Sequence, residues 1–469
     1  MANSVTPIAP GSFTSFAAGH TAYHQAARMS RSNYWRSQRI PWLIVLLALT
    51  LTIVDGAIRK WVIGSSFQLW SYAVYFSKDF AFALLLLCPA RHKASAALRT
   101  FRHWLVPGAF LLLCGALASS TETVSVAGAI LTLRGALLLP LMAFLIVPRL
   151  PANGLPATLV LITAFSIANV FLGIYQNHLP VGHELNRYAA ELAQVTSTES
   201  GVRATGTFSY ITGMGIFSVV GVWAGMVHLS LAQSNRQRLL GWITLVGALG
   251  CGLTSVSRWS VIVDLAMFLV WLFFSGSSFG KNVRIALSGA VLLALTIYTG
   301  VAGIFFDLQR GMALRFETAG DPLGERAFGQ LAEALRALEM APLGNGLGTE
   351  QIGRVVHITN SLSDFANFES QLPRLVMETG ALGLAGFLLV FFGAVMALEV
   401  AKRSANYRSD KAMLLATQLF LVPTAYTNIV FNHIASAFVW MIFTVVMASA
   451  AGGEKQDASA VDFIGTDLR

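Results

Sequence analysis

Residues 381–398 read ALGLAGFLLVFFGAVMAL, a continuous apolar stretch without a single charged side chain. A helix of this length covers most of the hydrocarbon core of a bilayer. Similar stretches recur along the whole chain, which is 55% hydrophobic and only 12% charged, with a mean hydropathy of +0.63. Soluble domains carry about 25% charged residues. The sequence therefore predicts an all-α protein, a polytopic transmembrane helical bundle.

The apolar stretches predict about twelve membrane spans. Their expected bounds are 40–55, 69–89, 104–118, 124–147, 156–177, 208–231, 238–255, 259–275, 284–305, 374–400, 412–430 and 433–451. Basic residues gather in alternate connections, such as Arg36 and Arg39 before the first span and Lys402 and Arg403 after the tenth. Because positive residues favour the cytoplasmic side, both termini are expected in the cytoplasm. The net charge of +9 is thus interpreted as a record of topology and not as a sign of nucleic-acid binding.

This pattern divides the chain into five parts. Residues 1–39 are expected to form a disordered cytoplasmic tail, since they lack the apolar core of a cleavable signal. Residues 40–305 hold spans one to nine, and residues 374–452 hold spans ten to twelve. Between them lies a large extracytoplasmic loop, residues 306–373, and residues 453–469 form a second cytoplasmic tail.

The loop of residues 306–373 is patterned, which argues against a simple linker. Four apolar residues share one face and predict an amphipathic helix over about 323–340: Phe328, Leu331, Leu335 and Leu338. Proline and glycines then predict a turn at 342–349, and a second short helix is expected over about 361–372. Such helices would lie against the membrane face and cap a cavity.

Four polar segments stand out at the expected outer face. They are Arg203–Tyr210, Leu253–Arg258, Arg326 with the turn at 342–349, and Glu369–Gly383. Arginine binds phosphate and carboxylate through a planar fork of donors. Topology disfavours positive charge at the outer face, so the arginines there predict an anionic ligand on that side. The alternative is that these arginines are ordinary surface charges paired with nearby acidic residues.

These four segments, in this order, resemble the O-antigen ligase and polysaccharide polymerase (Wzy-type) family. That family shows an Arg-x-x-Gly-x-Phe segment, a Ser-Arg pair after a span, an amphipathic helix followed by Pro-Leu-x-Gly-x-Gly, and a Glu-x-Gly-x-x-Gly span. The segment Asp55–Trp61, with Lys78 and Asp79 after it, is also similar to the start of some exopolysaccharide polymerases. The resemblance covers about residues 50–400.

The resemblance implies a multi-pass protein of the bacterial inner (cytoplasmic) membrane that transfers a glycan from undecaprenyl pyrophosphate to an acceptor sugar. By the resemblance, Arg203 and Arg258 would bind the pyrophosphate, with Arg326 and Arg315 as further candidates. No metal, cofactor or nucleic acid is implied. The partners would be the lipid-linked oligosaccharide, the acceptor glycan and membrane lipid. The resemblance also leaves room for a chain-length regulator and export proteins.

Two residues are candidates for the catalytic base. Glu369 stands where the family's ligases usually carry a histidine, and this departure favours a polymerase. A carboxylate at a membrane edge can take the proton of an acceptor hydroxyl. The alternative for Glu369 is a helix-terminal charge that interacts with the dipole of the tenth span. His357 is the second candidate base, and its alternative is an ordinary loop histidine.

Two other functions remain open from the sequence. A ligase would share the chemistry but attach polymer to a lipid A core. A lipid-linked oligosaccharide flippase would be expected to show internal repeats and broken helices at the midplane. No convincing repeat is found, and the polar residues lie at the outer edge, which favours an enzyme.

Charged residues within the apolar stretches are costly and often functional. They are Lys78, Asp79, Arg134 and Asp264. Lys78 and Asp79 would point about 100° apart on a helix, so they need not pair with each other. Arg134 is expected to reach an acidic partner across helices. A structural polar network and a proton or substrate path are both compatible with this pattern.

Overall fold

The structure is a computed structural model that describes residues 39–63, 68–91, 94–119, 126–187, 197–198, 201–275, 323–348, 371–427 and 433–466. Nearly all of these residues are helical, which confirms the all-α prediction. One short antiparallel pair is the exception among them, formed by β1 (Ser197–Thr198) and β2 (Gly201–Val202). Helices dominate because a bilayer offers no hydrogen-bond partners to the backbone.

The helices follow one another in a simple order. The first covers Arg39–Ile63 and ends in the π-helical segment η1 (Ile58–Ile63). The next elements are α2 (Gln68–Leu84), η2 (Leu85–Leu87), α3 (Ala96–Ala118), α4 (Val126–Leu133), the π-helical η4 (Arg134–Leu138), α5 (Leu139–Ile146), η5 (Val147–Arg149), η6 (Ala152–Gly154) and α6 (Leu155–His178). The remaining elements are η7 (Glu184–Asn186), α7 (Ile211–Leu231), α8 (Asn235–Thr254), α9 (Arg258–Phe274), α12 (Leu323–Met340), α14 (Gln371–Ser404), α15 (Arg408–Thr427) and α16 (His433–Thr466).

Seven helices in the described part are long and apolar enough to cross a membrane. They are Arg39–Ile63, Ala96–Ala118, Gly128–Arg149, Ala152–His178, Ile211–Leu231, Gln371–Ser404 and Ile434–Ala451. The other expected spans fall on shorter or more polar helices, except 284–305, which lies outside the described residues. The structure thus supports a multi-pass membrane protein, and the number and direction of the crossings stay predictions.

Two expected boundaries need correction. The third span was expected to begin at residue 104, but α3 begins at Ala96, because the Ser95 hydroxyl accepts the Leu98 N–H and caps the helix there. The first helix continues past residue 55 to Ile63, since residues 58–63 keep helical turns in the wider π form.

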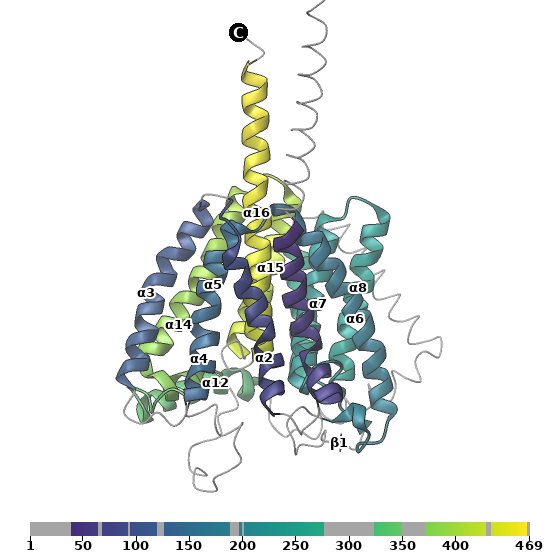
Figure 1. Ribbon diagram of the computed structural model, residues 1–469, viewed down its shortest axis with the longest axis vertical. Coiled ribbons are helices and arrows are strands. Elements are labelled where there is room, and N and C mark those ends of the chain that lie inside the picture. Colours follow the sequence, from purple (N-terminus) through teal and green to yellow (C-terminus); the bar gives the residue numbers. More distant parts are fainter. Residues whose placement is uncertain are drawn as a thin grey trace, which may run out of the picture.

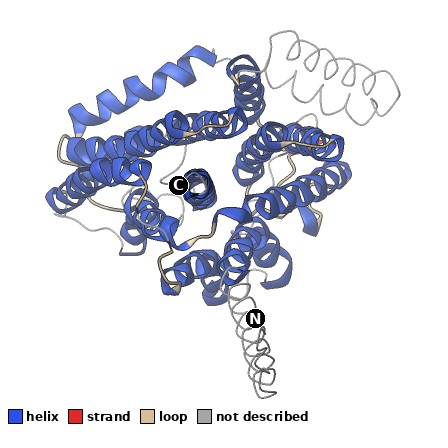
Figure 2. Ribbon diagram, turned by 90° about the horizontal axis from the view of Figure 1, so that it is seen from above, coloured by secondary structure: helices blue, strands red, loops and turns tan. Residues whose placement is uncertain are grey.

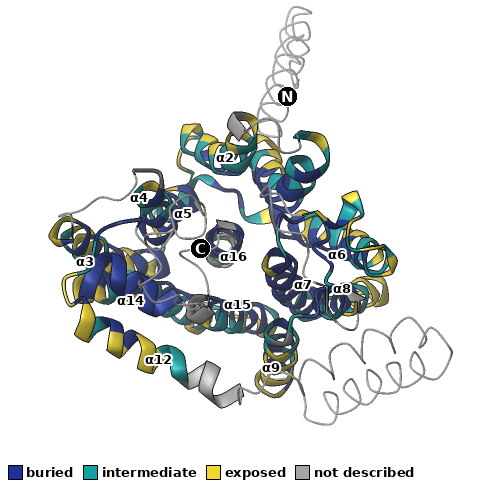
Figure 3. Cartoon of the chain, turned by 90° about the horizontal axis from the view of Figure 1, so that it is seen from below, coloured by how far each residue is buried: buried dark blue, intermediate teal, exposed yellow. Residues whose placement is uncertain are grey.

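The helices are arranged around α16. Seen along the bundle, α16 lies at the centre and the other helices surround it (Figures 2 and 3). Its residues from Ile434 to Ala448 are almost completely buried, and 83% of its apolar window lies inside the protein. The same fraction holds for α7. A helix that is hydrophobic all round and buried in this way is typical of the core of a large bundle.

Helices α3 and α14 approach each other through glycines. A Cβ atom on Gly108 would lie 2.7 Å from the carbonyl oxygen of Gly386, and one on Gly115 would lie 2.5 Å from that of Thr379. Small residues let two helix backbones come this close inside a membrane. The Gly-rich start of α14 therefore has a packing role, and its position is fixed by α3.

The amphipathic helix expected at 323–340 is confirmed as α12. It lies across one end of the bundle, at the same end as β1, while the C-terminal end of α16 projects from the opposite end (Figure 1). Ala334, Ala337 and Ala341 are buried, whereas Leu331 and Leu335 are more than half exposed. Figure 3 shows buried and exposed residues along α12. The alanines of α12 and the one directly after it, more than the leucines, thus pack on the bundle. The second short helix, at 361–372, falls almost wholly outside the described residues.

Candidate functional site

The end of the bundle that carries α12 also holds two of the segments singled out in the sequence, Asp55–Trp61 and Arg203–Tyr210. The Thr207 hydroxyl donates to the carbonyl of Ile53 at 2.7 Å. A Cβ atom on Gly56 would lie 2.1 Å from the backbone nitrogen of Ser209. The two segments are therefore in backbone contact, and only glycine at position 56 allows it.

Two amides of α6 hold the loop that follows Arg203. The side-chain oxygen of Gln176 accepts the N–H groups of Thr205 and Gly206 at 3.1 and 2.8 Å. The side-chain oxygen of Asn169 accepts the Thr207 N–H at 2.8 Å. Both amides are fully buried. This loop has buried partners for three successive N–H groups, so its shape is set by α6.

Arg203 contacts the turn that precedes Arg258. Its Nε donates to the carbonyl of Ser255 at 3.3 Å, and a terminal nitrogen lies 3.5 Å from that of Val256. The N–H of Ala204 donates to the carbonyl of Thr254 at 3.1 Å. The structure thus brings together the first two sequence segments predicted to bind an anion. It also shows that part of the Arg203 guanidinium is used to hold the turn.

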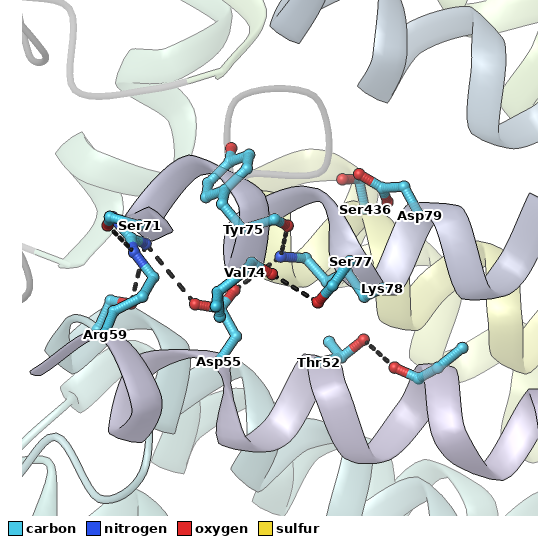
Figure 4. A network of polar contacts seen from close by, with 12 residues as sticks. Thr52, Asp55, Arg59, Ser71, Val74, Tyr75, Ser77, Lys78, Asp79 and Ser436 are labelled. Atoms are coloured by element: carbon cyan, nitrogen blue, oxygen red, sulfur yellow. Dashed lines mark hydrogen bonds and ion pairs between the residues drawn. The ribbon is translucent and has the colours of Figure 1, made fainter. Parts of the chain in front are cut away.

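Asp55 joins the first helix to α2 through ion pairs. The Lys78 ammonium donates to Asp55 at 2.7 Å, and both side chains are completely buried. Arg59 lies 3.6 Å from the other Asp55 oxygen and donates to Ser71 at 2.8 Å and to Ser209 at 3.3 Å. Figure 4 shows Lys78 between Asp55 and the backbone of α2. One carboxylate thus serves two cations.

A second ion pair joins α2 to η4. Arg134 donates to both oxygens of Asp79, at 2.6 and 2.7 Å, and to Ser436 of the central helix at 3.3 Å. The adjacent residues Lys78 and Asp79 therefore have different partners, which agrees with the expectation that they need not pair with each other. The prediction that Arg134 reaches an acidic residue on another helix is confirmed.

The ring of Tyr75 lies among three of these cations. Lys78 Nζ is 4.5 Å from the ring centroid, and the guanidinium carbons of Arg59 and Arg134 are 5.5 and 5.9 Å away. Cations at such distances are attracted to the electron-rich face of an aromatic ring. Tyr75 thus connects the two ion pairs into one cluster.

The other two sequence segments also meet. The N–H of Ala381 donates to the carbonyl of Pro342 at 2.9 Å, and the N–H of Asn345 donates to that of Met377 at 2.6 Å. Helix α14 breaks at this point, where Gly380 has φ 66° and ψ −164°. The turn at 342–348 is therefore fixed to the start of α14 through backbone hydrogen bonds.

A buried carboxylate joins the start of α14 to α4. Glu378 is fully buried and accepts the Thr132 hydroxyl at 2.6 Å. Thr132 lies two residues before Arg134 on the same helical stretch. This hydrogen bond therefore joins the start of α14 to the helical stretch that continues into Arg134.

The structure places only some of the predicted site residues. Arg203 is described fully, and Arg258 begins α9 and Arg326 lies in α12, with only their backbones described. Arg315, His357 and Glu369 lie outside the described residues. Sequence reasoning missed the roles of Gln176, Asn169 and Ser436, because a lone amide or hydroxyl in an apolar helix forms no motif.

Asp264, the fourth charged residue within the apolar stretches, lies apart from this cluster. It is buried on α9 and contacts the Ser218 hydroxyl of α7, which in turn lies 2.8 Å from the carbonyl of Ala248 on α8. It thus joins three helices and fits a structural role.

The chain matches no protein-family model, and no curated protein matches it in sequence.

Proposed function

We propose that the protein polymerises lipid-linked glycan repeat units at the outer face of the bacterial cytoplasmic membrane. The substrate would be an oligosaccharide on undecaprenyl pyrophosphate, and the acceptor would be a sugar hydroxyl of a second glycan. The acceptor oxygen attacks the anomeric carbon, and the bond from that carbon to the pyrophosphate oxygen breaks. The pyrophosphate leaves with the electron pair, and the hydroxyl proton passes to a base, for which Glu369 is the candidate.

One observation carries this proposal. The four sequence segments that resemble the polymerase and ligase family meet in two pairs, at the end of the bundle that also holds α12. The loop after Arg203 contacts the turn before Arg258, and the turn at 342–348 is hydrogen-bonded to the start of α14. Segments far apart in the chain that converge on one end support a shared site.

The requirement for cations follows from the leaving group. Charge builds up on the pyrophosphate as its bond to the sugar breaks, and fixed cations stabilise that charge. Arg203 and Arg258 are the candidates to supply them, and Arg203 contacts the turn that precedes Arg258. Part of Arg203 is bonded to carbonyls, which would hold its guanidinium in a fixed orientation.

The test is a glycan ladder from a strain that lacks the gene. A polymerase predicts loss of long chains with a single repeat unit retained. Long chains left on the lipid carrier would instead identify a ligase, and repeat units that accumulate in the cytoplasm would identify a flippase.

The site is tested in the same strain with substituted proteins. Glu369→Gln and Arg258→Ala are each expected to abolish chain growth while protein levels stay normal. Glu350→Gln, in the same loop, and Arg187→Gln, at an exposed residue of the same end, are the matched controls and should restore the ladder. Normal ladders with both site variants would exclude this assignment.

A further inference from the structure

Lys60 is a buried cation without a counter-charge in the described part of the protein. It lies in the π-helical segment η1 and is only 8% exposed. The ion pairs near it join Arg59 and Lys78 to Asp55, and Arg134 to Asp79. None of them includes Lys60. The two carboxylates of these ion pairs are thus already shared among three other cations.

The Lys60 ammonium uses only some of its donors. It donates to the Thr205 hydroxyl at 2.8 Å and to the carbonyl of Gly206 at 3.0 Å. An ammonium group has three N–H donors, so one is left. Its nitrogen lies 4.8 Å from the centroid of the Trp61 ring, a cation–π contact that brings no counter-charge.

Trp61 adds a second unused donor beside it. Its indole nitrogen is buried and has no hydrogen-bond partner among the described residues. An indole N–H can only donate. Adjacent residues of one π-helical segment therefore each hold a donor that lacks an acceptor.

Such an arrangement costs folding free energy unless a ligand supplies the missing counter-charge and acceptor. A buried charge without a partner, or a buried donor without an acceptor, destabilises the folded protein. Single-turn π segments occur frequently at functional sites. The second π segment, η4, begins at Arg134, whose donors bond Asp79 and Ser436. At η1, an anionic oxygen would satisfy both Lys60 and Trp61.

We infer that Lys60 and Trp61 form an oxyanion-binding subsite for a single carboxylate or phosphate oxygen of a substrate. The inference rests on the proposed function only for the molecule that carries this oxygen, either an acidic sugar of the glycan or the phosphate of its lipid carrier. A compact ammonium and one indole N–H suit a single oxygen atom, whereas arginine suits a bidentate anion.

The loop partners of Lys60 keep the ammonium in place before a ligand arrives. Thr205 and Gly206 accept from Lys60 through a side chain and a carbonyl, while their own N–H groups bond Gln176 of α6. Binding in a preorganised site avoids the cost of ordering the side chain. The subsite is separate from the Arg203 guanidinium, which bonds the carbonyls of Ser255 and Val256.

The test is a thermal-unfolding measurement on the purified full-length protein in lipid nanodiscs, at constant ionic strength. The probes are sodium glucuronate, inorganic pyrophosphate and, as a neutral sugar, glucose. At least one anion should raise the unfolding midpoint of the wild type, and glucose should not. Glucuronate alone would identify the acidic sugar as the source of the oxygen, and pyrophosphate alone would identify the phosphate. A shift with both would mean that the subsite accepts either oxygen.

Two variants and one control decide the outcome. Lys60→Met removes the charge and should weaken the anion response at least tenfold, with a ligand-free midpoint equal to or above that of the wild type. Trp61→Phe keeps a ring but removes the N–H, and should weaken the response several-fold. Lys402→Met, which removes a lysine paired with Glu399, should respond like the wild type.

The inference is overturned if neither anion shifts the wild type, or if Lys60→Met and Trp61→Phe both keep the full response. Should Lys60→Met fail to fold, Trp61→Phe still decides. If the ladder test fails but the anion response persists, the proposed function is wrong and the subsite stands. If the ladder test succeeds but the anion response is absent, the proposed function stands and the subsite is wrong.

Discussion

Arg134 and Asp79 form a bidentate pair, with two hydrogen bonds of 2.6 and 2.7 Å between side chains 55 positions apart in the sequence. The guanidinium also donates to Ser436 at 3.3 Å. Three elements are thereby joined, α2, η4 and the central helix α16. Arg134 is only 3% exposed and Asp79 14%. Removing either side chain would therefore leave the other as a largely buried charge without its ion-pair partner.

The first prediction concerns this pair. Arg134→Gln should destabilise the folded protein by about 3–5 kcal/mol, because it leaves the Asp79 carboxylate without its cation. The measurement is unfolding of the purified protein in detergent or nanodiscs.

The double variant Arg134→Leu with Asp79→Leu serves as the control. It should recover most of the loss, because no charge is then left unpaired. If Arg134→Gln unfolds at the wild-type midpoint, the pair does not stabilise the bundle.

The second prediction concerns the contact between the first helix and the Arg203 loop. Gly56→Ala would place a methyl group 2.1 Å from the Ser209 nitrogen, so one backbone has to move. Such overpacking typically costs about 1–3 kcal/mol or more. We expect lower thermal stability and weaker activity. Gly182→Ala, where the added atom meets nothing within 4 Å, should behave like the wild type.

The third prediction concerns the break in α14. Gly380 has a backbone conformation open almost only to glycine, and its Cβ would lie 2.5 Å from the Pro342 oxygen. Forcing another residue there costs about 1–3 kcal/mol. Gly380→Ala should release the turn at 342–348 from α14, which limited proteolysis would detect as faster cleavage after residue 340.

The matched control for that experiment is Gly329→Ala in α12. No atom lies within 4 Å of the added methyl group, and alanine is the better helix former by about 1 kcal/mol. It should leave the cleavage rate unchanged or lower it. Equal cleavage of the Gly380→Ala and wild-type proteins would contradict the docking described for the turn.

The fourth prediction concerns the ring of Tyr75. Tyr75→Leu removes the aromatic face that three cations share, and each such contact contributes about 0.5–2 kcal/mol. Tyr75→Phe keeps the ring and should retain more of the stability than Tyr75→Leu. The comparison is again made by thermal unfolding, and equal losses in the two variants would show that the ring face contributes nothing.

Local pattern was enough to predict several features. The apolar stretches located the helices, and the spacing of residues 323–340 with the glycines after it predicted α12 and its turn. Helical geometry also indicated that Lys78 and Asp79 need not pair with each other. These features depend only on residues close together in the chain, so they can be predicted from the sequence.

Other features depend on residues far apart in the chain. Nothing in the sequence identified Asp55 as the partner of Lys78, or placed α16 at the centre of the bundle. The use of Arg203 to hold the 255–256 carbonyls was also unexpected, because an arginine in an outer segment looks the same whether it bonds a ligand or a backbone. The buried amides Gln176 and Asn169 gave no signal for the same reason.

We expect the converged polar segments to carry out glycan transfer. The most direct test is chain elongation by the purified full-length protein in nanodiscs, supplied with lipid-linked repeat units and followed by gel. We expect a ladder of longer chains from the wild type and from Arg187→Gln, and none from Arg203→Gln. Absence of elongation by the wild type, or a full ladder from Arg203→Gln, would contradict it.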